Sequence, residues 1–295
     1  MMLVGLDLEN IDDIDVLTKM LKLTYSNEDW LPMIDIADKL YKETCVIYFY
    51  QREQAEEGRR VYKGVHERSL LYYFGFSQLA KGISLQKQGR YPESRDCISK
   101  YQDLSWLDKT SVLDNKIIED FRVYAIGNTY TLDLLEGKEE SLPDYIEHIK
   151  STKTDALELL AGIITILEAA LKNNFVIDWV LEEFSYSLNE LKKAYFDNPI
   201  KIRYFTEYLY LFSLYNFKQK DYSVAIQNTL EALAVSVTLK DNTAFKKMVV
   251  LFEAFREHAT QEQEQSYRLQ LKTILEGVLT DEKNISFIDF HSNSN

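Results

Sequence analysis

The feature that most constrains the fold is the position of the prolines. The chain has 4 prolines, and each stands where a helix can begin: Pro32, Pro92, Pro143 and Pro199. Proline fits the first turn of a helix because its missing N–H would have no partner there. Between these points apolar residues recur every three or four positions rather than every two, which is the spacing of one helical face. The pattern predicts an all-α chain.

The same periodicity predicts where the helices lie, with short connections between them. The predicted ranges are 11–24, 29–51, 66–88, 92–105, 115–136, 141–150, 154–173, 176–195, 199–218, 222–239, 242–258 and 262–278. Residues 45–50 have the composition of a strand, but no second strand is available to pair with them, so we expect the end of a buried helix. Residues 58–64 are expected to form a loop, and residues 280–295 a frayed tail.

The composition argues against several classes of function. The net charge is -13, with 47 acidic and 34 basic residues. A protein that holds DNA by its phosphates needs a clustered basic face. The composition therefore argues against DNA binding by this chain alone and favours a neutral or cationic peptide partner.

The chain has no apolar run of membrane-spanning length and no basic, signal-like N-terminus, so we expect a cytoplasmic protein without a membrane partner. Cys45 and Cys97 lack metal-ligand spacing and are expected to be small core residues in a reducing compartment.

Three segments resemble tetratricopeptide repeats, which are pairs of antiparallel helices. Residues 209–233 (LYLFSLYNFKQKDYSVAIQNTLEAL) carry the turn and the small residues Ser213, Ala225 and Ala232. A second copy runs from Gly82 through the turn at 87–91, and a partial third copy is 126–130 (IGNTY). Small residues are needed where paired helices touch, and stacked pairs form a curved groove. The repeats predict a right-handed superhelical solenoid of tetratricopeptide-like helix pairs.

Residues 66–278 are also similar to the C-terminal repeat region of helix-turn-helix regulators from Bacillus and related bacteria, near the peptide-sensing quorum receptors. The stretch SLLYYFGFSQLAKGISLQKQGRYPESRDCISKYQDLSW carries most of this resemblance. It implies a domain that binds a short secreted peptide on its concave face and dimerises. Residues 1–65 do not resemble the helix-turn-helix of those regulators, so DNA contact is expected only through a missing or separate module.

The predicted organisation is therefore N-terminal helices and a loop at 1–65, the repeat domain at 66–278 and a flexible tail at 279–295. Aligning the three repeats places six side chains on the groove-facing side of the first helix in each pair. These candidate ligand-binding residues are Phe76, Lys87, Tyr124, Asn128, Tyr210 and Lys218. The Asn128 amide could pair with a peptide backbone through both its donor and its acceptor. The alternative is that Asn128 only bonds a neighbouring helix.

Other segments have weaker interpretations. Arg59, Arg60 and Lys63 either receive a carboxylate or form a solvated loop, and residues 285–290 (ISFIDF) could dock within the chain. The last predicted helix has an apolar stripe that either caps the solenoid or forms a homodimer: Tyr267, Leu271, Ile274 and Leu275.

The chain carries no catalytic or cofactor fingerprint, and its 4 histidines are scattered singly. We therefore predict a protein that is not an enzyme and holds no cofactor or metal, a peptide sensor that controls a transcriptional regulator. The alternatives are a constitutive scaffold that binds other proteins, and a response-regulator phosphatase-like solenoid with Gln51 and Gln54 as candidate amides.

Overall fold

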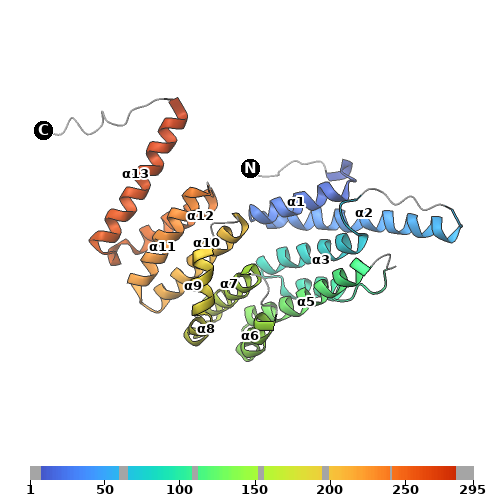
Figure 1. The fold of residues 1–295 in the computed structure, drawn as a ribbon, viewed down its shortest axis with the longest axis horizontal. Helices are drawn as coiled ribbons and strands as arrows, with labels where there is room; N and C mark the ends of the chain where they lie inside the picture. Colours follow the sequence, from blue (N-terminus) through green and yellow to red (C-terminus); the bar gives the residue numbers. More distant parts are fainter. Residues whose placement is uncertain are drawn as a thin grey trace. The chain divides into compact units, whose positions relative to one another are not determined.

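The structure is a computed structural model that describes residues 8–59, 66–107, 112–151, 156–194, 199–239 and 241–283. Within these residues all regular secondary structure is helical, and there is no strand (Figure 1). It divides into two compact units, Met1–Tyr145 and Ile146–Asn295, and the boundary falls inside a helix.

Unit 1 contains α1 (Ile14–Ser26), α2 (Trp30–Glu56), α3 (Leu70–Lys87), α4 (Tyr91–Tyr101), α5 (Val112–Leu135) and the start of α6 (Leu142–Ser151). Unit 2 continues with α7 (Ala156–Asn173), α8 (Asp178–Glu183), α9 (Ser185–Ala194), α10 (Pro199–Lys218), α11 (Tyr222–Thr238), α12 (Asn242–Phe255) and α13 (Gln261–Lys283). Short 3-10 turns are η1 (Leu8–Asn10), η2 (Glu139–Ser141) and η4 (Arg256–His258).

The proline prediction is confirmed at all four positions. Pro32, Pro92, Pro143 and Pro199 lie in the first turns of α2, α4, α6 and α10. The segment with strand-like composition, residues 45–50, is helical and lies inside α2. Residues 45–50 form helix instead of strand because the helical spacing of apolar residues continues without a break on both sides of them.

Several predicted boundaries were wrong. The helix predicted at 66–88 begins at Leu70, because Ser69 is its N-cap and accepts the backbone N–H of Leu71 at 3.3 Å. The helix predicted at 176–195 is interrupted at Phe184, whose φ of -96° and ψ of 3° leave the helical region. Since Phe184 is buried and is neither glycine nor proline, the sequence carries no local signal for this break. The tail prediction was wrong at 280–283, which belong to α13; residues 284–295 fall outside the described residues.

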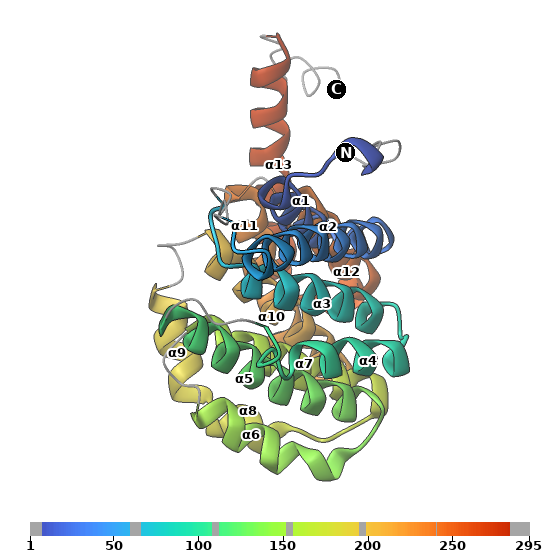
Figure 2. The same ribbon diagram turned by 90° about the vertical axis from the view of Figure 1, so that its right-hand side faces the viewer.

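In unit 1, α3 is the central helix. It packs on α1 and α2 on one side and on α4 and α5 on the other (Figures 1 and 2). Two glycines of α3 allow these close approaches. A Cβ on Gly82 would lie 3.3 Å from the Cβ of Cys97 in α4, and one on Gly75 would lie 2.3 Å from the Phe121 ring in α5. The expected small residue between paired helices is thus present at Gly82.

In unit 2, α10 packs on α7 and α11, and α11 packs in turn on α12 and α13. The small residues that the repeat pattern selected, Ser213, Ala225 and Ala232, are fully buried. The Tyr267 ring of α13 stacks on Phe252 of α12 with 3.8 Å between ring centroids. The first half of α13 is therefore fastened to its own unit.

Candidate functional site

One face of α3 is only partly covered by its neighbours. The positions that face the other helices are buried, including Tyr73, Phe74, Gly75 and Leu85. A stripe at helical spacing is half-buried, apart from the exposed Lys87 at its end: Tyr72, Phe76, Leu79, Ile83 and Lys87. These residues are three or four positions apart and therefore share one face. We call this stripe, together with Lys22 of α1, Arg68 just before α3, and Tyr124 and Asn128 of α5, the open face of unit 1.

Aromatic rings connect α3 to α5 along the open face. Phe76 and Tyr72 are stacked, with 5.3 Å between their centroids. Tyr72 lies 6.4 Å from Phe121, and Phe121 lies 5.9 Å from Tyr124 in an edge-on arrangement. Phe121 is buried, whereas 42% of the Tyr124 surface is exposed. The half-buried rings of Phe76 and Tyr72 and the exposed ring of Tyr124 are thus joined through the buried ring of Phe121, so a ligand would meet rings that the core holds in place.

Asn128 has one definite partner. Its side-chain nitrogen donates to the Tyr101 hydroxyl of α4 at 2.9 Å. Burial raises the pKa of Tyr101 above its usual range, and the bond from Asn128 partly opposes that shift. This contact matches the alternative interpretation, in which Asn128 bonds a neighbouring helix. The bond uses the amide nitrogen only, and since Asn128 is partly exposed, its carbonyl oxygen remains able to accept a hydrogen bond from a ligand.

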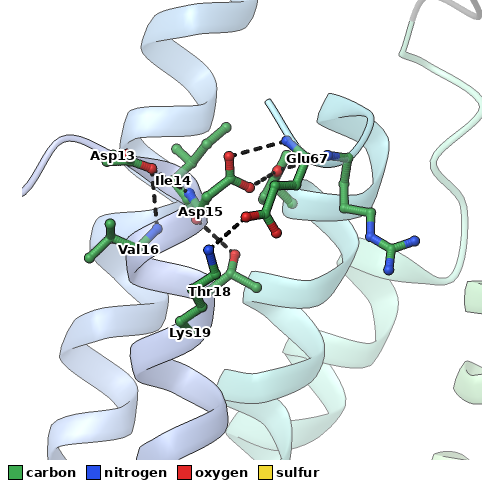
Figure 3. Close-up of polar contacts among 9 residues, drawn as sticks. Asp13, Ile14, Asp15, Val16, Thr18, Lys19 and Glu67 are labelled. Carbon is green, nitrogen blue, oxygen red and sulfur yellow. Dashed lines mark hydrogen bonds and ion pairs between the residues drawn. The ribbon is translucent and has the colours of Figure 1, made fainter. Parts of the chain in front are cut away.

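Polar contacts fix α1 against the start of α3, at one end of the open face (Figure 3). Asp15 accepts the backbone N–H of Glu67 at 3.1 Å and also accepts the Tyr73 hydroxyl. Lys19 pairs with Glu67 at 2.6 Å. Burial, reinforced by the bond to Asp15, raises the pKa of Tyr73, whose ring is fully buried. The Tyr73 hydroxyl therefore stays protonated and keeps donating to Asp15.

Two cations lie beside the stacked rings. The Lys22 ammonium is 6.0 Å from the Phe76 centroid, and the Arg68 guanidinium carbon is 5.6 Å from the Tyr72 centroid. Lys22, Arg68 and Tyr72 were not predicted from the sequence. Tyr72 had a usable signal, since it precedes Phe76 by one helical turn, but Lys22 and Arg68 fall outside the repeat copies that were aligned.

The predicted ligand-binding residues divide between the two units. Phe76, Lys87, Tyr124 and Asn128 belong to unit 1, and the structure joins Phe76 to Tyr124 through the aromatic row. Tyr210 and Lys218 are on α10 of unit 2 and belong to a separate set of contacts.

In unit 2, the Lys247 ammonium lies 5.4 Å from the Tyr210 ring centroid. Lys218 donates to the carbonyl of Leu171 at 3.0 Å, near the end of α7. A cation at this position satisfies a terminal carbonyl and opposes the helix dipole. Lys218 thus has a structural contact that the sequence did not reveal.

The remaining candidates from the sequence are the basic cluster at 59–63, residues 285–290, and the amides of Gln51 and Gln54. Arg59 pairs with Glu57 at 2.9 Å on the surface, while Arg60, Lys63 and residues 285–290 fall outside the described residues. Gln51 and Gln54 are partly exposed on the last turns of α2.

The two cysteines and the possible metal-binding side chains were also considered as functional groups of the described residues. Cys97 is buried and Cys45 partly buried, and burial raises the pKa of both thiols. In the part of the chain that the structure describes, no group of three or more His, Cys, Asp or Glu side chains could hold a metal ion.

Comparison of the chain with protein-family models, with curated proteins and with solved structures finds no significant match. Within the described residues, none of the helices combines the length and the apolar character needed to cross a membrane.

Proposed function

We propose that this chain is a tetratricopeptide-like solenoid that binds a short peptide on the open face of unit 1. The observation that carries the proposal is the row of rings from the half-buried Phe76 to the exposed Tyr124, which is anchored in the core by Phe121. Aromatic side chains offer apolar contact area and lose little conformational entropy on binding. The free carbonyl of Asn128, one helical turn from Tyr124, would accept a peptide N–H beside these rings.

The packing of unit 1 supports the solenoid. Helices α1 and α2 form one antiparallel pair and α3 and α4 the next, and α3 contacts both α1 and α5. In such a stack the first helices of successive pairs line one side, which is where the open face lies. The resemblance to the repeat regions of helix-turn-helix regulators suggests the role: peptide binding in the cytoplasm would control a transcriptional regulator, with no catalytic step.

A second candidate function is a constitutive scaffold. Val46, Phe49 and Tyr50 share one face of α2, and each is more than half exposed, at 56%, 58% and 58%. Trp106, which is 53% exposed, lies 6.1 Å from Tyr48 between ring centroids. Exposed apolar groups of this kind favour a protein partner. A stable stoichiometric complex that survives mutation of the open face would support the scaffold instead of the peptide receptor.

The proposal is tested by thermal unfolding of the full chain with and without a concentrated peptide fraction from the culture medium of its source organism. A ligand at ~100 times its Kd stabilises by about 2.7 kcal/mol, and each kcal/mol moves the midpoint of a domain of this size by roughly 2–4 °C. We expect a shift of several degrees that disappears when the fraction is first digested with protease.

Tyr124→Ala should reduce that shift, because truncation of an aromatic contact residue costs roughly 1–2 kcal/mol of binding. The matched control is Tyr186→Ala, which removes a tyrosine of α9 that is 76% exposed. Equal shifts in the two variants would rule out the open face as the binding site.

A further inference from the structure

The local charge of the open face differs from the charge of the whole chain. Lys22 and Arg68 are both exposed, and neither forms an ion pair with any residue that the structure describes. They lie beside Phe76 and Tyr72, whose rings are 5.3 Å apart. Two cations therefore flank one stacked aromatic pair.

Two acidic side chains beside the start of α3, Asp15 and Glu67, have partners other than these cations. Glu67 pairs with Lys19 at 2.6 Å. Both oxygens of Asp15 accept hydrogen bonds, one from the Glu67 backbone and one from the Tyr73 hydroxyl. In the structure, these two carboxylates therefore make their contacts with Lys19, Tyr73 and the Glu67 backbone, and not with Lys22 or Arg68.

We propose that the ligand of the open face is an acidic peptide whose carboxylates pair with Lys22 and Arg68, while its apolar parts cover Tyr72 and Phe76. The proposal rests on the peptide-binding function above and names the chemistry of that ligand. It reverses the expectation from the net charge of -13, which favoured a neutral or cationic peptide. The net charge of -13 is spread over the whole surface, and charges more than roughly 10 Å away are largely screened at ordinary ionic strength. The charge that the open face prefers in a peptide therefore depends on the nearest unpaired groups.

The experiment uses the immobilised full chain and two pools of randomised heptapeptides, acetylated and amidated so that only side chains carry charge. One pool contains Asp and Glu without Lys and Arg, and the other contains Lys and Arg without Asp and Glu. Retained peptides are identified by mass spectrometry, and the best of them are titrated in solution. We expect retention from the acidic pool, with acidic residues next to apolar ones.

The substitutions are Lys22→Gln and Arg68→Gln, and both remove charge from exposed side chains. Each should weaken binding of a retained acidic peptide about fivefold, the equivalent of an ion pair of ~1 kcal/mol. The matched control is Lys42→Gln, at an exposed lysine of α2 outside the open face, which should leave the affinity unchanged.

Each result has a distinct meaning. Retention from the basic pool alone, or acidic peptides bound equally by all variants, would overturn the carboxylate pairing and leave peptide binding intact. No retention from either pool by chain whose circular dichroism is helical would overturn the peptide-binding function itself.

Discussion

At the scale of single residues, Gly75 sets the distance between α3 and α5. A Cβ there would lie 2.3 Å from the Phe121 ring, far inside van der Waals contact. Phe121 cannot turn away freely, because Tyr72, Tyr101 and Tyr124 surround its ring at centroid distances of 6.4, 6.1 and 5.9 Å. The open face therefore depends on a position that must remain without a side chain.

Gly75→Ala should lower the free energy of unfolding by about 1–3 kcal/mol through overpacking, despite the gain of up to ~1 kcal/mol in helix propensity. Gly82→Ala is the matched control on the same helix, since its Cβ would lie 3.3 Å from Cys97. We expect Gly82→Ala to be clearly the milder of the two in urea unfolding. Equal effects would show that α3 and α5 separate easily.

At the scale of helices, much of the structure could be predicted from the sequence. Proline at the first turn and the three-to-four spacing are local signals, and they located the starts of α4 and α10 to within a residue. The break at Phe184 had no such signal, because it depends on burial of the ring in unit 2. The contact from Lys218 to α7 also depends on tertiary packing, since it joins residues 47 positions apart.

The candidate site was predicted only in part, for the same reason. Phe76 and Tyr124 were found because they repeat at the spacing of the motif. Lys22 was not, because it reaches Phe76 from α1, a helix outside the aligned repeats. Asn128 was selected by position, but its bond to Tyr101 depends on how α4 and α5 pack.

Helix α1 supplies Lys22 to the open face, and its own start depends on one cap. Asp13 accepts the backbone N–H groups of Asp15 and Val16 at 2.8 and 3.2 Å. Asp13→Ala should therefore cost about 1 kcal/mol of stability. Asp12→Ala is the control, because its side chain is 76% exposed and pairs with Lys39 at 3.3 Å, a contact worth ~0.5 kcal/mol or less. Urea unfolding that ranks Asp12→Ala as the more damaging change would contradict the capping role.

At the scale of the whole molecule, both units bury tyrosines whose hydroxyls must stay protonated. Burial raises the pKa of Tyr73 and Tyr101 in unit 1 and of Tyr208 in unit 2. Burial, followed by the hydrogen bond to Glu253, raises the pKa of Tyr267 to about 12. These four side chains are at most 7% exposed, at 0%, 1%, 7% and 1%. The folded chain therefore opposes ionisation of these four groups in both of its units.

This arrangement predicts loss of stability in alkali. Below pH ~10, the tyrosines are protonated in both folded and unfolded chains, so they add no pH dependence. As the pH rises from ~10, the unfolded chain releases these protons first, and the free energy of unfolding falls until the folded pKa is reached, about 12 for Tyr267. Urea unfolding across this range should show the decline, and tyrosinate absorbance should rise together with loss of helix. Tyr267→Phe should make this decline in the free energy of unfolding shallower. Tyr186→Phe is the control at an exposed ring and should leave the decline unchanged. A free energy of unfolding that stays constant above pH ~11 would mean that solvent reaches the buried hydroxyls.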